Sequence, residues 1–309
     1  AKAHERGFLG EKRMIASFCT EHLIPLAQNV PLSGYTTFRI GGTADYVVTP
    51  ENTQQMVSLI RFLEEKKLRY FILGRGSDIL ASDQGYRGVI VSTAKMNSLR
   101  REDHRIFAGA GCSMASVSNL AQREGLAGLE FLHGIPGSIG GGVYMNAGAY
   151  GSEISNFIEF VLWVDPTGSV HVSTGDELEF SYRHSYFSNH PGVICSVALR
   201  CQPGEPDQIR SVMADLDSRR REKQPLEYPS AGSAFKRPAG HFAGKLIEDC
   251  GLKGCSVGGA CVSEKHAGFI VNKGGATSED VQCLIRHVSD TVFDQTGVRL
   301  EPEIRFLEE

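Results

Sequence analysis

Apolar residues recur every three or four positions in four parts of the chain, which predicts four amphipathic helices. Asn52 and Ser113 stand at the start of the first two patterns, and residues of these types cap helices. The last pattern follows the capping sequence Thr277–Asp280, and Gly297 is expected to end that helix. The apolar positions of the four helices are Met56, Leu59, Ile60 and Leu63; Val117, Leu120 and Ala121; Ile209, Val212, Met213 and Leu216; and Val281, Leu284, Ile285, Val288 and Val292.

Short apolar runs between these helices predict β-strands. Several of the strands form hairpin-like pairs, and strands do not alternate regularly with helices. We therefore expect an α+β fold rather than a doubly wound parallel sheet. A change of composition at Gln202–Pro206 indicates a domain boundary. The predicted strands lie at residues 45–49, 69–73, 89–91, 106–108, 160–164 and 193–199, with the last two in a second sheet.

The composition is that of an ordinary globular protein, since 41% of the 309 residues are apolar and 22% are charged. A formal net charge of -4 argues against binding to nucleic acid or to a membrane surface through bulk charge. The basic cluster Arg219–Lys223 is either a solvated helix face or a site for a phosphorylated small molecule.

The cysteines indicate a reducing environment. The chain has 8 cysteines but no C-x-x-C pair, so free thiols are expected and a metal site is not. No apolar run approaches the roughly 20 residues that span a bilayer. The first residues also lack the apolar core of a secretory signal, so we expect a cytoplasmic protein.

Glycine is concentrated in three segments: Gly74–Asp78, Gly109–Gly111 and residues 134–151. The first two follow predicted strands, but neither continues to the third glycine of a Rossmann fingerprint, and no P-loop sequence is present. Each segment alone is as well explained by a tight turn. The three together favour a cradle of backbone N–H groups around the pyrophosphate of a dinucleotide.

Six segments carry a resemblance to a known family. In sequence order the chain resembles UDP-N-acetylenolpyruvoylglucosamine reductases from about residue 25 to its C-terminal end. The segments are Asn29–Gly42, Leu73–Asp78, residues 134–151, Ser181–Ser185, Pro229–Lys236 and Leu300–Phe306. The chain is similar to the compact branch of the family, because the longer insertions of the larger branch are absent.

The resemblance implies an FAD-binding domain of the vanillyl-alcohol-oxidase type, built from two α+β subdomains, and a smaller α+β substrate-binding domain. These would occupy residues 34–202 and 203–309, after an N-terminal extension and helix at residues 1–33. FAD would be bound without a covalent bond, since Ser77 stands where some relatives of this fold carry the attachment histidine. Asp78 departs from the more frequent asparagine of the family and places an acid beside the pyrophosphate. The implied cofactor-binding residues are Arg39, Gly41, Gly42, Gly74, Arg75, Gly76, Ser77, Asp78, Gly134, Ile135, Pro136, Gly137, Ser138, Asn146 and Gly148.

The resemblance also implies a reaction, in which NADPH and FAD reduce an enolpyruvyl ether of UDP-N-acetylglucosamine to UDP-N-acetylmuramate for peptidoglycan synthesis. A hydride reaches the methylene carbon, so the neighbouring carbon must be protonated while charge spreads into the carboxylate. Arg183 matches the charge stabiliser, Ser233 the proton donor and Glu303 the acidic partner of the family. Glu301 lies on the same side of a strand as Glu303, and only the motif separates the two.

Four further residues match substrate-binding positions of the family: Tyr150, Lys223, Arg237 and His266. Arg237 stands where some relatives have asparagine. Two alternatives stay open from the residues alone. One is an oxidase of the same fold that reduces oxygen, and the other is a nucleotide-binding module without turnover.

Overall fold

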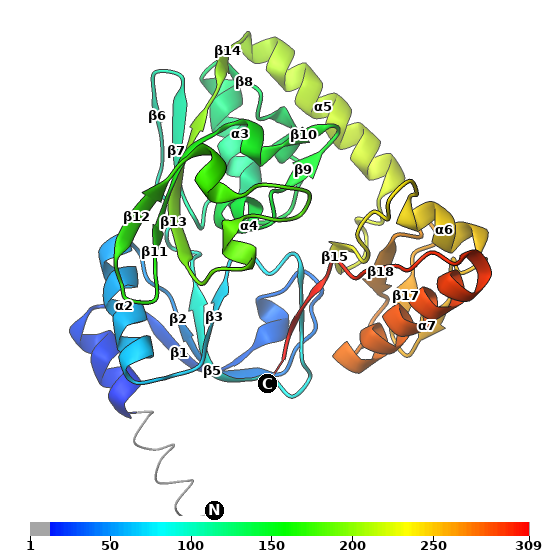
Figure 1. The fold of residues 1–309 in the computed structure, drawn as a ribbon, viewed down its shortest axis with the longest axis horizontal. Coiled ribbons are helices and arrows are strands. Elements are labelled where there is room, and N and C mark those ends of the chain that lie inside the picture. Colours follow the sequence, from blue (N-terminus) through cyan, green and yellow to red (C-terminus); the bar gives the residue numbers. More distant parts are fainter. Residues whose placement is uncertain (1–12, 309) are drawn as a thin grey trace, which may run out of the picture. The chain divides into compact units, whose positions relative to one another are not determined.

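The computed structural model describes residues 13–308, and the chain forms two compact units (Figure 1). The first unit contains the chain up to Val30, Asp45–Gly74 and Gly88–Pro206, and the second contains Pro31–Ala44, Arg75–Arg87 and the chain from Asp207 onward. Residues 1–12 of the expected N-terminal extension and helix lie outside the described residues, and residues 13–21 are helical. The α+β class is confirmed, because sheets and helices occur in both units.

The first unit contains two sheets. One sheet has four strands in the order β1-β2-β5-β3, and the other has five strands in the order β12-β11-β13-β7-β6. The strands of the first sheet are β1 (Leu26–Pro31), β2 (Thr43–Val48), β3 (Tyr70–Leu73) and β5 (Tyr86–Ser92). Those of the second are β6 (Leu99–Glu102), β7 (Arg105–Gly109), β11 (Ile158–Val164), β12 (Val170–Ser173) and β13 (Val193–Arg200). Two short pairs are β8 (Leu126–Ala127) with β14 (Gln202–Pro203), and β9 (Gly148–Ala149) with β10 (Ser152–Glu153).

The helices of the first unit begin where their caps were expected. Asn52 accepts a hydrogen bond from the Gln55 N–H at the start of α2 (Thr53–Glu65), and Ser113 caps α3 (Met114–Arg123) in the same way. The apolar face of α2 is completely buried and packs with apolar residues of both sheets. The glycine-rich segment forms a further helix, α4 (Ile139–Tyr144). Short 3-10 helices lie at Leu32–Gly34, Glu130–Leu132, Ile154–Asn156, Gly175–Leu178 and Tyr186–Ser188.

The second unit has one four-stranded sheet, in the order β15-β18-β17-β16, and a parallel strand pair, β4 with β19. Its helices are α5 (Pro206–Lys223), α6 (Ala243–Asp249) and α7 (Ser278–Thr296). Its strands are β4 (Ile79–Ala81), β15 (Ser230–Ser233), β16 (Ser256–Val257), β17 (Ala260–Val262), β18 (Phe269–Asn272) and β19 (Arg305–Leu307).

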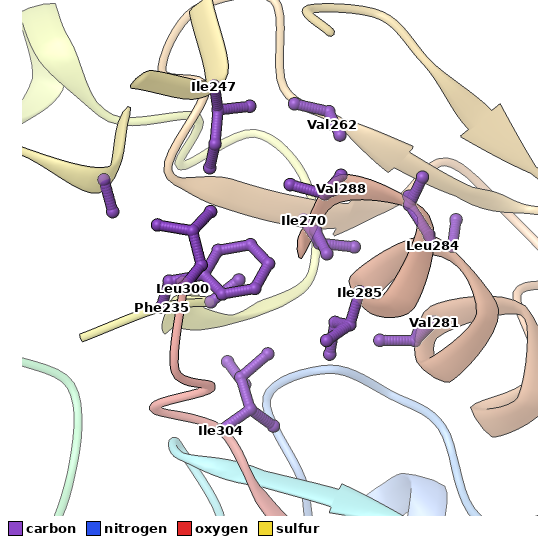
Figure 2. Packing of buried hydrophobic residues seen from close by; sticks show 14 of the residues in the cluster. Phe235, Ile247, Val262, Ile270, Val281, Leu284, Ile285, Val288, Leu300 and Ile304 are labelled. Carbon is purple, nitrogen blue, oxygen red and sulfur yellow. The ribbon is translucent and has the colours of Figure 1, made fainter. Parts of the chain in front are cut away.

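The core of the second unit is organised around α7. Thr277 and Asp280 form the predicted capping box, and Gly297 ends the helix at a φ of 72°. The predicted apolar stripe of α7 is completely buried against side chains from the sheet, α6 and the C-terminal segment, as Figure 2 shows. The stripe predicted on α5 is partly wrong, because Ile209 and Met213 are buried but Val212 is 48% exposed.

Two early segments of the chain pack into the second unit, which makes this unit discontinuous in sequence. Phe38, Ile40 and Leu80 belong to the same apolar core as α7. The buried Asn272 amide donates to the Phe38 carbonyl oxygen at 3.1 Å. The packing units are discontinuous in sequence and so are not the contiguous ranges 34–202 and 203–309, and the last boundary between them lies between Pro206 and Asp207. The binding roles of those ranges remain a prediction.

Asp83 joins the second of these segments to α7. Its carboxylate accepts the Ser278 N–H at 2.8 Å and the Ser278 hydroxyl at 2.7 Å, while the Asp83 N–H donates back to that hydroxyl at 3.0 Å. We expect Asp83→Ala to lower the free energy of unfolding by about 1–3 kcal/mol, since it leaves the buried Ser278 N–H and hydroxyl without their acceptor. Urea denaturation measures this loss. Asp83→Asn, which keeps one acceptor oxygen, should lose less, and equal stability of the alanine variant and the wild type would contradict the role of this contact.

The described cysteines are all free thiols, as expected. Burial raises the pKa of Cys195 and of Cys201 to about 12, so both stay protonated and unreactive at neutral pH. Within residues 13–308, no group of side chains has the composition of a metal site, and no helix has the length and apolar character needed to cross a membrane.

Candidate active site

The Gly74–Asp78 turn begins where strand β3 ends. Gly76 is buried with a φ of 60°, and a Cβ at this position would overlap the Tyr35 carbonyl oxygen, so only glycine fits. The Gly76 carbonyl oxygen accepts the Thr37 N–H at 3.1 Å. The N–H groups of Gly76 and Ser77 donate to no acceptor among residues 13–308. This turn of the second unit therefore offers backbone donors to an anion.

The neighbouring segment Arg39–Gly42 is built for close backbone contact as well. Arg39 is exposed and has a φ of 56°. A Cβ on Gly42 would overlap the Asp83 carbonyl oxygen, and a Cβ on Gly41 would lie 2.7 Å from the Ala81 Cβ. Both glycines therefore let this segment pack directly on the chain that follows strand β4.

In the first unit, Gly74 packs against the start of α4. A Cβ on Gly74 would overlap the Ser138 hydroxyl, which accepts the Gly141 N–H at 3.3 Å and so caps the helix. The N–H groups of the buried Gly137 and Ser138 donate to no acceptor in the described part of the chain. Gly134, Ile135 and Pro136 precede them, and the Ile135 N–H closes a turn on Leu132 at 3.1 Å.

In each unit by itself, such donors suit a phosphate group of a cofactor such as FAD. Backbone N–H groups before a helix and in a glycine turn favour negative charge, and no protein acceptor within residues 13–308 competes for the two in each unit. Ser77 provides no imidazole for a covalent flavin bond.

The Gly109–Gly111 turn does not take part in such a cradle, contrary to the expectation that all three glycine segments would. Its N–H groups donate to Ser98, Cys195 and Met96 carbonyl oxygens at 2.8–2.9 Å. Its two glycines instead allow close packing, since a Cβ on either would overlap a carbonyl oxygen of the segment 93–97. Glycines of α4 also serve packing, because a Cβ on Gly140 would lie 2.8 Å from the Ala110 Cβ.

The predicted substrate-binding residue Tyr150 and the predicted catalytic residue Arg183 of the first unit lie at the tips of two-residue turns. Tyr150, which is 49% exposed, has a φ of 56° in the turn between Gly148–Ala149 and Ser152–Glu153. Arg183 has a φ of 54° in the turn that Ser181 and His184 close with hydrogen bonds of 3.1 and 3.2 Å. Positive φ is unfavourable for both side chains, and such strain is concentrated at functional sites.

Asn146 was expected to border the cofactor, but its side chain is directed at protein groups. It is 1% exposed, its amide nitrogen donates to Glu153 and to the Ser181 carbonyl oxygen, and its amide oxygen accepts the Ser155 N–H. Any contact of this side chain with a ligand would have to replace one of these bonds. No sequence pattern indicated a role for Glu153, because that role depends on the hairpin that brings its side chain to Asn146.

The second unit brings Ser233 and Glu303 onto adjacent backbone segments. Phe235 and Pro302 form an antiparallel bridge, and the Glu303 N–H donates to the Ala234 carbonyl oxygen at 2.9 Å. Ser233 directly precedes Ala234, so the two predicted catalytic residues flank one paired strand segment, and both are half-buried. Arg183 belongs to the other unit.

The second unit also distinguishes Glu303 from Glu301. The Glu301 carboxylate forms an ion pair with the Lys236 ammonium at 2.6 Å, and its side chain is 71% exposed. Glu301 is therefore a solvated surface group whose charge is compensated. This environment agrees with the assignment of the acidic role to Glu303.

The remaining substrate candidates lie on separate elements of the second unit. Lys223 is exposed at the end of α5, and the exposed Arg237 guanidinium lies 4.0 Å from the centre of the Phe242 ring. His266 Nδ1 accepts the Gly268 N–H at 3.0 Å, which places the proton of the neutral ring on Nε2. Burial lowers the pKa of His266, so the imidazole is a neutral N–H donor at pH 7.

The cofactor class follows from a comparison with known domains. The family model of an FAD binding domain matches residues 44–174, which include α4 and the Tyr150 turn but not the Arg183 turn. With the fold described above, this match shows that the chain is a flavoprotein with an FAD-binding domain.

Relatives define the family more narrowly. The model of the UDP-N-acetylenolpyruvoylglucosamine reductase C-terminal domain matches residues 224–307. The reductase of this name from Caldanaerobacter subterraneus subsp. tengcongensis is 44% identical over 281 residues, 91% of this chain and 93% of the relative. The one from Clostridium novyi is 46% identical over 284 residues, 92% of each. The crystal structure of UDP-N-acetylenolpyruvylglucosamine reductase from Thermus caldophilus has a TM-score of 0.77 and 34% identity, and the match covers 92% of this chain and 98% of that chain. The chain belongs to the UDP-N-acetylenolpyruvoylglucosamine reductase family.

Proposed function

We propose that this protein reduces the enolpyruvyl ether of UDP-N-acetylglucosamine to UDP-N-acetylmuramate, with NADPH as the electron source and FAD as the bound cofactor, for peptidoglycan precursor synthesis. The observation that carries the proposal is the pairing of the Ser233 and Glu303 segments within a domain that matches the C-terminal domain of these reductases. We place the reaction in the cytoplasm, because both UDP-sugar and NADPH are intracellular metabolites and the described cysteines are free thiols.

The cofactor roles are proposed for each unit by itself. In the first unit, the N–H groups of Gly137 and Ser138 are proposed to donate to a phosphate of FAD. In the second unit, the N–H groups of Gly76 and Ser77 are proposed to bind an anionic group of the cofactor, and the exposed Arg39 and Arg75 side chains supply positive charge. FAD, when bound, supplies the hydride that reduces the substrate double bond.

Residues of the chain then have two tasks. The Arg183 guanidinium is proposed to face the substrate carboxylate and to stabilise the negative charge that develops there as the methylene carbon gains hydride. The Ser233 hydroxyl is proposed to donate its proton to the carbon next to the carboxylate, and it regains a proton from solvent. Glu303 is proposed to share a proton with the site beside Ser233. A serine hydroxyl is by itself a weak acid, so it needs a neighbouring group of this kind to act as a proton donor.

The substrate diphosphate and sugar call for additional donors. We propose that Lys223 and Arg237 contact the phosphates, that Tyr150 contacts the substrate from its turn, and that His266 donates from Nε2. The tautomer deduced above supports the role of His266, since a neutral N–H donor suits a phosphate or carbonyl oxygen.

FAD is expected to bind non-covalently at one molecule per chain. Acid precipitation of the purified protein should release the yellow colour into the supernatant, because no histidine is present at position 77 for attachment. In the same preparation under anaerobic conditions, NADPH should be consumed beyond one equivalent per flavin only when the enolpyruvyl substrate is added. Colour retained in the pellet would contradict the cofactor assignment. Flavin reoxidation by oxygen that equals substrate consumption would favour an oxidase, and FAD binding without any NADPH oxidation would favour a module without turnover.

A further inference from the structure

The buried Asn146 amide connects two turns that are distant in sequence. Its Nδ2 donates to Glu153 Oε2 at 2.9 Å and to the Ser181 carbonyl oxygen at 3.0 Å, so both amide hydrogens are used. Its Oδ1 accepts the Ser155 N–H at 3.2 Å. Asn146 itself has a φ of 44°, a conformation that asparagine tolerates better than most residues. One side chain therefore determines the positions of three backbone segments of the first unit.

The first of the two bonds stabilises the Tyr150 turn. Glu153 lies opposite Gly148 in the β9–β10 pair, and Tyr150 and Gly151 form the connection with φ values of 56° and 83°. A turn with two positive φ values favours asparagine followed by glycine, so tyrosine in the first position is unfavourable there. Gly148 leaves room for the Glu153 side chain, since a Cβ on it would lie 2.9 Å from Glu153 Cγ.

The second bond stabilises the Arg183 turn. The Ser181 carbonyl oxygen accepts both the His184 N–H at 3.2 Å, which closes the turn, and the Asn146 amide. Ser185, which follows the turn, donates its hydroxyl to the Tyr144 carbonyl oxygen at 2.7 Å. Both ends of the Arg183 turn are thus attached to the segment 144–146, while Arg183 is held at positive φ between them.

We propose that Asn146 is a positioning residue, whose amide holds Tyr150 and Arg183 in the strained conformations that present them to the substrate. This proposal rests on the substrate roles given above. Strained conformations persist only where the surroundings impose them, and Asn146 is the side chain shared by both turns. A residue at this place acts through its NH2 donor, which no side chain of the same shape except asparagine provides.

Asn146→Asp tests the role of the NH2 donor. The aspartate keeps the shape of the side chain and its acceptor oxygen, but it places a second acceptor oxygen, in place of the NH2 group, next to Glu153 and the Ser181 carbonyl oxygen. Amide hydrogen exchange in residues 148–153 and 181–184 should accelerate at least about tenfold, as these turns open. FAD content and the rate of flavin bleaching by NADPH should remain within about twofold. Flavin reoxidation by the enolpyruvyl substrate should slow by about 10–100-fold, since misplacement of a positioned group by 1 Å has effects of this size.

Variants of Glu153 test the Tyr150 turn separately from the Arg183 turn. Glu153→Leu removes only the acceptor of the Tyr150 turn, so the substrate KM should rise while the reoxidation rate at saturation changes little. Glu153→Gln keeps an acceptor oxygen and should have a smaller effect. Asn156→Asp is the matched control, because it makes the same chemical change at an exposed position in the same segment. It should match the wild type in every measurement.

Unchanged hydrogen exchange in both turns of Asn146→Asp would overturn the proposal, and so would equal slowing of both half-reactions together with loss of FAD. If Asn146→Asp does not fold, Glu153→Leu decides by the exchange rate of residues 148–153 alone. Failure of the wild type to oxidise NADPH with the substrate would instead refute the proposed function. The exchange measurement needs no turnover, so it still decides whether Asn146 holds the two turns.

Discussion

Glu303→Gln is expected to slow the reoxidation of the flavin by the enolpyruvyl substrate by about 10²–10³, while NADPH bleaches the flavin at its normal rate. The neutral amide keeps the size of the side chain and its place beside Ala234, but it cannot exchange a proton at neutral pH. The selective loss follows because Glu303 is assigned to the enolpyruvyl substrate and not to nicotinamide. Stopped-flow absorbance of the two half-reactions measures both rates.

Glu301→Gln is the matched control for this variant. It makes the same change two residues away, where the carboxylate is exposed and paired with Lys236. Exposed ion pairs contribute at most about 1 kcal/mol, so both half-reactions should remain close to those of the wild type. Equal slowing of both half-reactions in Glu303→Gln would mean that Glu303 shapes the protein and takes no part in the chemistry. An effect of Glu301→Gln as large as that of Glu303→Gln would reverse the assignment of the two acids.

Ser233→Ala is expected to make protonation the slow step and to lower turnover by about 10²–10⁴, the usual contribution of a general acid. The change removes one hydroxyl and little volume from strand β15, so FAD binding and substrate affinity should persist. Ser233→Cys should recover part of the turnover, because a thiol also donates a proton. Steady-state rates in H2O and D2O check the assignment, since a slow protonation enlarges the solvent isotope effect.

Ser230→Ala serves as the control for Ser233, because it removes a hydroxyl from the same strand. Its backbone carbonyl, which accepts the Thr37 hydroxyl at 2.7 Å, is unaffected by the substitution. Near-normal turnover of Ser233→Ala would show that another group or an ordered water donates the proton. The role proposed for Ser233 would then have to be abandoned.

Several residues of the candidate site were identified from motifs, but their surroundings were not. The resemblance placed Arg183, Ser233 and Glu303 in a common reaction, whereas the positive φ of Arg183 and the pairing of Glu303 with Ala234 are visible only in the structure. The resemblance assigned Asn146 to the cofactor. Its hydrogen bonds to Glu153 and Ser181 could not be foreseen, because no local pattern indicates which turns meet in space.

The Gly109–Gly111 turn shows why glycine content alone was misleading. Glycine permits both close backbone packing and exposure of N–H groups to a ligand, and the sequence is the same in the two cases. Here the N–H groups donate to carbonyl oxygens of other segments, two in the preceding residues 96–98 and one at the distant Cys195. Val212 is a comparable case, because helical periodicity defines a face but does not determine how much of that face a neighbour covers.

The sequence by itself determined the elements whose stability is local. The caps at Asn52, Ser113 and Thr277 and the buried stripes of α2 and α7 follow from hydrogen bonds and side-chain spacing within a few residues. Only the tertiary structure decided that residues 31–44 and 75–87 pack with the C-terminal part of the chain. That decision depends on contacts such as those between Asp83 and Ser278, 195 residues apart, and between Asn272 and Phe38, 234 residues apart. A local sequence pattern does not indicate which distant residues will interact, because their interaction free energy arises only after the chain has brought them together.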